Sequence, residues 1–243
     1  MQDNTDSIYL KNIQDMLSCA LGRSFGLQET RLMIMHLRYV LKMNTAVNLT
    51  SILNEESGIL LHIEDSLTAL QEIEDVCDGK LVDLGSGGGF PGIPLAITTG
   101  RHTTLIEATK KKACAIETFI WENRMRDKII VEAKRIEEYS RTTRECFAVA
   151  TARALAPLST LMELAAPLLV QGGALVAYKG NLSDSELQRA REAEDMLGMK
   201  MSGSRRLMLS DGMTQRELVV FKKIKKPEVE LPRRNGKAQK NPF

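Results

Sequence analysis

A strand that runs into four glycines within five positions is the feature that most constrains this 243-residue chain. Residues 81–84 read LVDL, which indicates the end of a buried strand, and the glycines follow within 85–89. Residues 92–97 then read as the first turns of a helix. Glycine lacks a Cβ and readily adopts positive φ, so such a turn lets the backbone approach a ligand closely, beside the free N–H groups of the helix start. The pattern predicts a nucleoside site; the alternative is a tight turn that binds nothing.

The spacing of the glycines distinguishes between the classes of ligand that such turns bind. The dinucleotide fingerprint G-x-G-x-x-G/A needs a small residue where this chain has Phe90, whose ring would crowd a pyrophosphate. A P-loop needs Gly-Lys followed by Ser or Thr, and the turn does not continue in that way. S-Adenosylmethionine has no phosphates and suits an acidic strand residue followed by glycines and a hydrophobic residue. We therefore predict that S-adenosylmethionine is bound by Asp83, Gly85, Gly87, Gly89 and Phe90.

The same stretch resembles the small-subunit ribosomal RNA methyltransferase G family, also called glucose-inhibited division protein B. The family pattern D-[LV]-G-[ST]-G-x-G-[FL]-P-G-[IL]-P-[LI]-A matches residues 83–96 throughout. Shorter family motifs match N-L-T at 48–50, H-I-x-D-S at 62–66, R-x-E-E at 135–138 and K-G at 179–180. The resemblance implies a bacterial enzyme that methylates guanine N7 in the 530 loop of 16S ribosomal RNA, at guanosine 527.

Alternating strand and helix patterns predict the rest of the fold. They favour a parallel sheet with helices on both faces, and a turn signal at 210–212 predicts an antiparallel hairpin at its edge. The expected class is α/β, a Rossmann-like seven-stranded S-adenosylmethionine-dependent methyltransferase fold with an N-terminal helical extension. The predicted strands are 81–84, 102–108, 128–133, 147–151, 172–178, 199–209 and 216–224, and the predicted helices are 5–21, 28–43, 58–73, 92–99, 113–125, 157–169 and 182–197.

Charge is distributed unevenly over the three expected parts of the chain: a helical extension at 1–55, a methyltransferase domain at 56–226 and a basic tail at 227–243. The net charge is +2, but residues 222–243 hold eight Lys or Arg and only two Glu, so the remainder is net negative. This asymmetry favours a polyanion partner reached from one end, 16S ribosomal RNA or the small ribosomal subunit. A solvated, disordered tail is the alternative.

The cysteines and histidines favour no metal site. The four cysteines form no C-x-x-C pair, and the three histidines lie too far apart in sequence to suggest zinc. The polar start MQDNTDS and the lack of an apolar run of membrane length predict neither a signal peptide nor a membrane span. We expect a cytoplasmic protein with reduced, buried thiols, no metal and no membrane. The residues concerned are Cys19, Cys77, Cys114, Cys146, His36, His62 and His102.

Four further residues complete the expected cofactor site. Glu107 ends the second strand, about 20 residues after the glycine turn, where a carboxylate can accept hydrogen bonds from both ribose hydroxyls. A surface glutamate is the alternative. The resemblance implies that Ile136 and Glu137 contact the adenosine. It also implies that Arg153, at the end of the fourth strand, lies in the cofactor site and acts in catalysis by holding substrate; an ion pair with a nearby glutamate is the alternative.

Two polar motifs have less specific interpretations. His62, Asp65 and Ser66 share one face of the predicted helix 58–73, because they stand three and four positions apart. They either shape the mouth of a site or form a solvated face with an ion pair. The side chains of 48–50 are interpreted as satisfying loose backbone groups at a turn.

The residues after the fourth strand narrow the chemistry. Amino methylation of adenine uses an N/D-P-P-Y/F motif there, whereas residues 152–155 read Ala-Arg-Ala-Leu, with Ala152 in place of the family's serine. Pyrimidine C5 methylation needs a cysteine nucleophile, and none is so placed. Guanine N7 has a free lone pair, so catalysis reduces mainly to positioning. The alternatives are a methyltransferase for another RNA, a protein or a small molecule, and a non-catalytic nucleotide-binding or cell-division factor.

Overall fold

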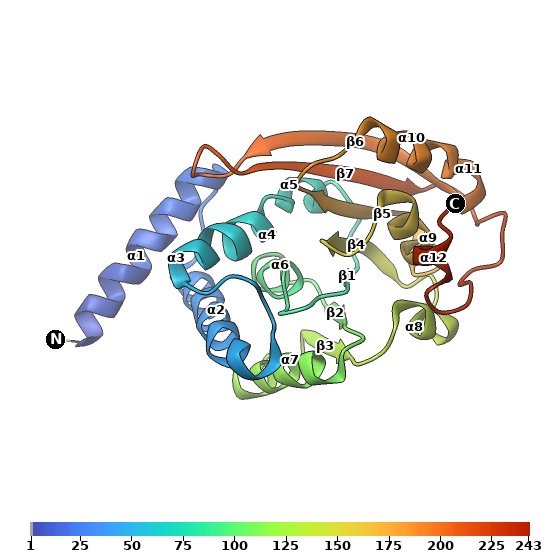
Figure 1. The fold of residues 1–243 in the computed structure, drawn as a ribbon. Coiled ribbons are helices and arrows are strands. Elements are labelled where there is room, and N and C mark those ends of the chain that lie inside the picture. Colours follow the sequence, from blue (N-terminus) through green and yellow to red (C-terminus); the bar gives the residue numbers. More distant parts are fainter. Residues whose placement is uncertain (1) are drawn as a thin grey trace.

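The computed structural model describes residues 2–243, with side chains from Asp6 onward. Within this range the chain folds around a seven-stranded sheet of order β3-β2-β1-β4-β5-β7-β6 (Figure 1). The pairs from β3 to β5 are parallel, and β7 is antiparallel to both β5 and β6. The predicted α/β class and the edge hairpin are therefore confirmed. The strands are β1 (Lys80–Leu84), β2 (Thr103–Ile106), β3 (Ile129–Glu132), β4 (Phe147–Arg153), β5 (Leu169–Lys179), β6 (Met199–Met208) and β7 (Gln215–Lys223).

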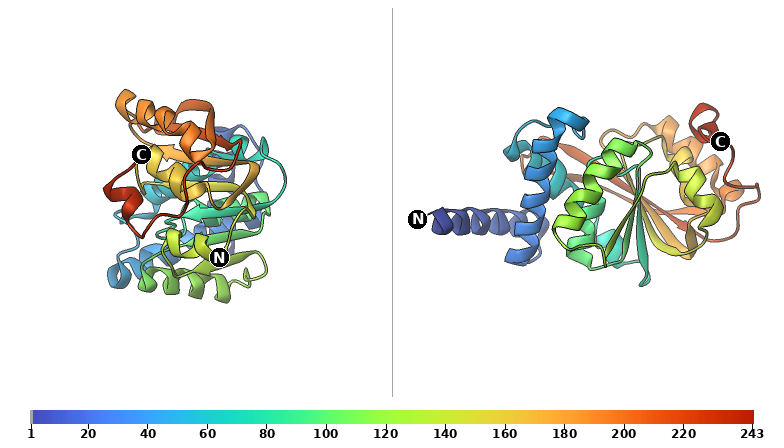
Figure 2. Two further views of the ribbon diagram at one scale, coloured as in Figure 1. Left: turned by 90° about the vertical axis from the view of Figure 1, so that its right-hand side faces the viewer. Right: turned by 90° about the horizontal axis from the view of Figure 1, so that it is seen from below.

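Helices cover both faces of the sheet, as right-handed crossovers between parallel strands require. The helices α6 (Gly92–Thr99) and α7 (Lys110–Glu122) pack on one face, and α8 (Ile136–Thr142) and α9 (Leu158–Ala165) pack on the other (Figure 2, right). Each face has its own apolar core. The face with α8 and α9 also carries α10 (Asp184–Glu192), α11 (Glu194–Leu197) and α12 (Lys237–Lys240).

Two long N-terminal helices confirm the predicted helical extension. The first, α1 (Gln2–Leu21), projects from the body, and the second, α2 (Leu27–Val47), packs against α6 and α7 (Figure 1). The prediction that the chain leaves this helix at Asn44 is wrong, because α2 continues to Val47 and ends with Asn48 in the left-handed region, at φ 57°. Asn44 does act at the turn: its side chain binds both the N–H and the carbonyl of Thr50, each at 2.8 Å.

The predicted single helix at 58–73 is wrong in its regularity. The chain forms α3 (Glu55–Gly58), a π-helical turn η1 (Ile59–Glu64), α4 (Asp65–Leu67) and α5 (Leu70–Glu74). Gly58 immediately precedes the π-helical turn η1 and packs against α2, where an added Cβ would lie 2.6 Å from a Leu37 methyl group. The polar face predicted here is not solvated, since Asp65 and Ser66 are buried.

The burial of the cysteines differs from the prediction. Three of the four cysteines are exposed and the fourth, Cys146, is half-buried, because their helix and loop positions face outward. The prediction of buried thiols is therefore wrong.

Residues 227–243 pack on α8 and α9, where Leu231 and Ala238 are buried and the Arg233 guanidinium pairs with Glu163.

Candidate functional site

The first half of the glycine turn forms an accessible loop at the carboxyl end of β1. Gly85 and Gly87 are partly exposed and have φ of 70° and 56°, so both occupy the left-handed region that favours glycine. The Gly85 N–H donates to the Ile106 carbonyl at 2.9 Å, which ties the loop to the end of β2. A Cβ on Gly87 would meet no atom closer than the Gly85 carbonyl oxygen at 4.0 Å. The loop therefore has free space beside Gly87.

Asp83 anchors this loop from inside the sheet. One carboxylate oxygen accepts the Gly92 N–H and the other accepts the Thr151 hydroxyl, both at 3.0 Å, so the side chain links β1 to α6 and β4. Asp83 is fully buried, and burial raises the pKa of its carboxyl to about 6, against the opposing effect of these hydrogen bonds. The structure thus places Asp83 beneath the turn, where it fixes the loop's geometry.

Glu107 lies against the open half of the turn, after β2. Its Oε2 accepts the Gly87 N–H at 3.0 Å and its Oε1 accepts the Thr109 N–H at 2.7 Å. Each oxygen keeps a second lone pair, since a carboxylate oxygen can accept two hydrogen bonds. The side chain is therefore held in place and keeps acceptor capacity next to the space at Gly87.

The second half of the turn is buried against α2. A Cβ on Gly88 would lie 3.4 Å from a Val40 methyl group, and a Cβ on Gly89 would lie 3.0 Å from His36 Nε2. The His36 ring nitrogen Nε2 bonds the Gly88 carbonyl at 2.9 Å. A carbonyl only accepts, so this nitrogen carries the proton. Burial lowers the pKa of His36 to about 3, which keeps the ring neutral.

Phe90 lies between two histidines at the junction of the turn and the neighbouring cleft. Its ring centroid is 4.3 Å from that of His36 and 4.4 Å from that of His62, and the His62 ring is nearly parallel to it, at 6°. The Arg153 guanidinium stands 5.9 Å from the same ring centroid. Only 5% of Phe90 is exposed, so its ring supports the site from below.

Arg153, at the end of β4, is the centre of a buried polar network. Its Nη1 donates to Asp65 Oδ2 at 2.9 Å and to the Leu61 carbonyl at 3.0 Å, and its Nη2 lies 3.1 Å from His62 Nδ1. The other Asp65 oxygen accepts from Arg216 Nε at 2.9 Å. The predicted alternative, an ion pair, is thus present with an aspartate, and the guanidinium is oriented with 14% of its side chain exposed.

A cleft of about 740 Å³ opens beside this network. Its walls include the residues after β4, the end of β5 at Lys179, and the loop between α2 and α3 at Ser51 and Ile52. The Lys179 ammonium pairs with Glu186 at 2.7 Å. The cleft thus joins an arginine, a lysine and an apolar floor at the carboxyl ends of the strands, which is where ligands bind in open α/β sheets.

Ile136 and Glu137 open α8 after β3, at the same edge of the sheet. Ile136 is buried in the core under α8, and Glu137 is 8% exposed. The Glu137 Oε1 accepts the Gly236 N–H at 2.6 Å, and Glu138 accepts from the Asn235 amide. The C-terminal segment therefore meets the site at the two glutamates of this helix.

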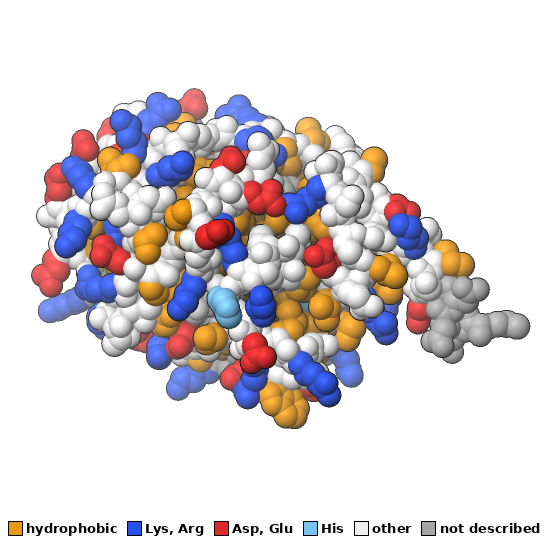
Figure 3. Space-filling view, turned by 180° about the vertical axis from the view of Figure 1, so that it is seen from behind, with side chains coloured by type: hydrophobic (Ala, Val, Ile, Leu, Met, Phe, Trp, Pro, Cys, Tyr) orange, Lys and Arg blue, Asp and Glu red, His pale blue; other side chains and the backbone are white. Residues whose placement is uncertain are grey.

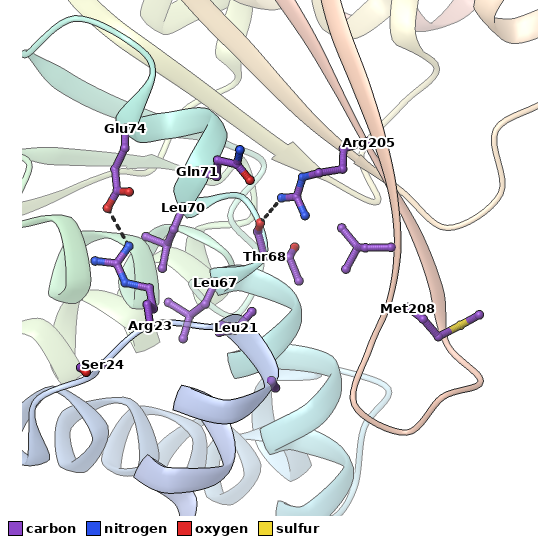
Figure 4. A pocket seen from close by; sticks show the side chains of 12 residues that line it. Leu21, Arg23, Ser24, Leu67, Thr68, Leu70, Gln71, Glu74, Arg205 and Met208 are labelled. Carbon is purple, nitrogen blue, oxygen red and sulfur yellow. Dashed lines mark hydrogen bonds and ion pairs between the residues drawn. The ribbon is translucent and has the colours of Figure 1, made fainter.

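A second pocket lies away from the strand ends, between α1, α5 and β6 (Figure 4). It has a volume of about 430 Å³ and an apolar floor that includes Leu67 and Leu70. Its two cations are already paired: Arg23 reaches Glu74 at 2.6 Å, and Arg205 reaches the Thr68 carbonyl at 2.6 Å and the Glu72 carboxylate. The pocket lies away from the carboxyl ends of the strands, where ligands bind in open α/β sheets, so we do not include it in the candidate site.

The outer surface adds no metal or membrane feature in the part of the chain that the structure describes. Residues 2–243 bring no three His, Cys, Asp or Glu together to hold a metal ion. None of the helices in this range has the length and apolar character to span a bilayer. The back of the molecule carries basic and acidic side chains interspersed with single apolar groups (Figure 3).

Sequence reasoning found the strand-end residues and missed their partners. The glycine turn, Asp83, Glu107 and Arg153 lie at neighbouring strand ends, whereas Ile136 is mainly a core residue. The sequence gives no indication that His36 and Arg216 contact this site. The i, i+2 spacing of Thr151 and Arg153 along β4 does place two polar residues on one face of a buried strand, where one bonds Asp83 and the other Asp65, and this spacing is a signal for buried acidic partners.

Comparison with known proteins shows which family the chain is similar to. The profile of the GidB family, described as rRNA small subunit methyltransferase G, matches residues 29–219. A protein named ribosomal RNA small subunit methyltransferase G from Carboxydothermus hydrogenoformans is 34% identical over 91% of this chain and 95% of its own length. The protein of the same name from Roseiflexus castenholzii is 38% identical over 82% of this chain and 86% of its own length.

Solved structures share the fold at low sequence identity. A geranyl diphosphate methyltransferase in complex with GPP and sinefungin is 14% identical, with a TM-score of 0.51 over 65% of this chain and 76% of that one. The YcgJ protein from Bacillus subtilis is 13% identical, with a TM-score of 0.51 over 66% of this chain and 98% of that one. These likenesses show the fold alone.

Proposed function

Because the chain belongs to the rRNA small subunit methyltransferase G family, we propose that it transfers a methyl group from S-adenosylmethionine to a guanine N7 of 16S ribosomal RNA. The proposed target is the 530 loop, at the guanosine that the family resemblance implies. The observation that carries this proposal is the pairing of an open glycine loop, at Gly87, with a cationic cleft beside Arg153. The glycine loop suits the methyl donor, and the cleft suits an anionic acceptor.

The residues around the open half of the turn fit S-adenosylmethionine, which supplies an electrophilic methyl group when bound. Gly87 leaves room for a ligand against the backbone, and the free lone pairs of Glu107 suit the two ribose hydroxyls. Asp83 acts by fixing the loop, and the backbone at Ile136 and Glu137 borders the adenine end. Phe90 contributes the wall between donor and acceptor. These assignments are proposals drawn from the position of each residue.

The acceptor side contains no group arranged as a general base among the described residues near the cleft. Arg153 is a cation. His62 is a weak base, because burial and the neighbouring arginine lower its pKa to about 3, and its Nδ1 lone pair already accepts from Arg153. Guanine N7 attacks with its own lone pair and releases no proton, so a site that only positions the base is sufficient. We assign Arg153 the role of holding the acceptor nucleotide through its exposed edge.

Ribosomal RNA contacts are proposed for the C-terminal basic segment and the N-terminal helices. Arg234, Lys237 and Lys240 are exposed at 234–240, whereas Arg233 is paired with Glu163 and the C-terminal ring of Phe243. Exposed cations attract the phosphate backbone, and binding that depends on them weakens as salt rises. The three-part division at residues 55 and 226 remains our working description of the chain. The proposed setting is the bacterial cytoplasm, where the small ribosomal subunit is assembled.

Mapping of methylated guanosines tests the proposed function. Small-subunit RNA from cells lacking the protein is compared by mass spectrometry with RNA from cells that carry it, and purified small subunits from the deficient cells are then incubated with the protein and labelled S-adenosylmethionine. We expect one 7-methylguanosine to be absent from the first sample and restored in the second. Label in another RNA or a small molecule alone would contradict the proposal, and absence of S-adenosylmethionine binding in calorimetry would favour a non-catalytic role.

A further inference from the structure

The loop that follows α2 meets the Arg153 network at Thr50. The Thr50 Oγ1 lies 2.7 Å from His62 Nε2 and also accepts the Ile52 N–H at 3.0 Å. Both backbone groups of Thr50 are held by the Asn44 side chain. Thr50 is partly exposed, and the next two residues, Ser51 and Ile52, line the cleft. A short polar chain thus runs from Arg153 through His62 to the edge of the acceptor cleft.

The direction of each hydrogen bond in this chain follows from the chemistry of its members. An arginine side chain can only donate, so His62 Nδ1 accepts from Arg153 Nη2 at 3.1 Å. The ring is neutral, so its proton is on Nε2 and is donated to Thr50 Oγ1. The Thr50 oxygen then accepts two hydrogen bonds, from His62 and from Ile52, and both of its lone pairs are occupied. Its own hydroxyl proton is the one hydrogen-bonding function left for a ligand.

We propose that Thr50 is a positioning and specificity residue of the acceptor site, whose hydroxyl proton is donated to the 6-carbonyl oxygen of the guanine. This inference rests on the proposed function and adds a role for the N-L-T motif. A donor at the 6-carbonyl leaves the adjacent N7 lone pair free to attack. Guanine presents two acceptors, N7 and O6, on this edge, whereas adenine presents an amino donor at position 6. Because the Thr50 oxygen has no free lone pair, it cannot accept from that amino group, and adenine is rejected.

The hydroxyl is held in this arrangement before any RNA arrives. His62 is stacked on Phe90 and fixed by Arg153, which is itself fixed by Asp65 and the Leu61 carbonyl. A donor whose direction is already set loses little freedom when the base binds, and such preorganisation raises the rate of a reaction that depends on positioning.

The test compares Thr50→Val, which removes the hydroxyl at similar volume, with Thr50→Ser, which keeps it. Methylation of small subunits from deficient cells is measured for both variants and for Thr118→Val, a matched control at an exposed threonine of α7. We expect Thr50→Val to lower kcat about tenfold to a hundredfold, the usual effect of one lost hydrogen bond to a buried acceptor. Thr50→Ser should restore most of the rate, and Thr118→Val should match the wild type. The Kd for S-adenosylmethionine should stay unchanged in all three variants, and the melting temperature should stay unchanged in Thr50→Ser and Thr118→Val. Thr50→Val leaves the His62 and Ile52 donors without their acceptor and should therefore melt a few degrees lower.

A second arm identifies the atom that Thr50 contacts. Small subunits are reconstituted with 2-aminopurine riboside, which lacks the 6-carbonyl, at the methylated position. The wild-type rate should fall to that of Thr50→Val on guanosine, and Thr50→Val should show no further loss. Full activity of Thr50→Val, or a loss of melting temperature and cofactor binding in step with kcat, would overturn the inference. A wild-type protein that methylates no guanosine would instead overturn the proposed function.

Discussion

The two halves of the glycine turn face different surroundings. Gly85 and Gly87 are partly exposed, and a Cβ on Gly87 would meet nothing within ordinary contact distance. Gly88 and Gly89 are buried, and a Cβ on Gly89 would press on His36 of α2. The same residue type therefore leaves room for a ligand at Gly87 and serves protein packing at Gly88 and Gly89. A run of glycines in a sequence does not distinguish these two demands.

The sharpest test of this difference is to place a methyl group in each half. In Gly89→Ala the Cβ would lie 2.7 Å from the Ile93 methyl group at φ 87°, so steric strain and overpacking add. We expect a loss of about 3 kcal/mol in the free energy of unfolding, measured by urea denaturation.

Gly87→Ala is the matched variant in the open half. Its Cβ finds free space, so only the left-handed backbone at φ 56° is strained, by about 1 kcal/mol. Its main effect should be on ligand binding, with the Kd for S-adenosylmethionine raised more than tenfold in calorimetry. Equal losses in the free energy of unfolding for Gly87→Ala and Gly89→Ala would contradict the difference between the two halves of the turn.

The buried carboxylate beneath the turn should respond to pH in a characteristic direction. The pKa of Asp83 is raised by burial to about 6 in the folded protein, above its unfolded value near 3.8, so the folded state holds the proton more tightly. Its contribution to stability is therefore complete below pH 4 and is lost as pH rises through 6, by about 2–3 kcal/mol. Asp83→Asn removes this dependence. The unfolding free energy of the variant minus that of the wild type should rise by that amount between pH 4 and 7; a constant difference would contradict it.

His36, on the packed side, should respond in the opposite direction. Burial lowers its pKa from 6.5 to about 3, so the unfolded chain binds the proton first as pH falls. The stability it contributes is present above pH 6.5 and declines by about 2 kcal/mol between pH 6.5 and 5. His36→Gln keeps a donor for the Gly88 carbonyl and should reduce that acid loss, as followed by denaturation at several pH values. His62 titrates in the same direction and is common to both proteins. An unchanged acid profile would show that His36 is not the group responsible.

The smallest expected effect concerns the ligand side alone. Glu107→Gln keeps one oxygen for an N–H of the loop but loses the charge and acceptor capacity available to ribose hydroxyls. We expect the Kd for S-adenosylmethionine to rise about tenfold, which is about 1.4 kcal/mol, with little change in the urea midpoint. A large drop in stability with unchanged affinity would assign Glu107 to the packed half of the comparison.

The fold was predictable because its signals are local. Aliphatic runs such as 81–84 and the glycine turn specify strand, loop and helix within about 20 residues, and right-handed crossovers then fix the sheet. The segment 58–73 is predicted as a regular helix whose polar face either shapes the mouth of a site or is solvated. Its burial depends on Arg153 and Arg216, which lie 88 and 151 residues away from Asp65 in sequence. No local periodicity encodes such partners.

The site was predictable only where strand ends carry recognisable residue types. Asp83, Glu107 and Arg153 were predictable as site residues from their places at strand ends. The contacts that each side chain makes were not predictable in this way. His36 is separated by 52 residues from the carbonyl it binds, and its helical spacing is that of an ordinary amphipathic helix. The sequence predicts a ligand-binding role for the glycines of the turn, although Gly88 and Gly89 pack against α2, the helix that carries this histidine.

The contact between α2 and the packed glycines has a consequence for biosynthesis. Translation completes residues 27–47 before it begins the segment 83–96, and chains acquire structure from the amino terminus during synthesis. The surface that shapes the loop is therefore already outside the ribosome when the loop emerges. A circular permutant that moved α2 to the far end of the polypeptide would preserve every contact and yet reverse this order of arrival.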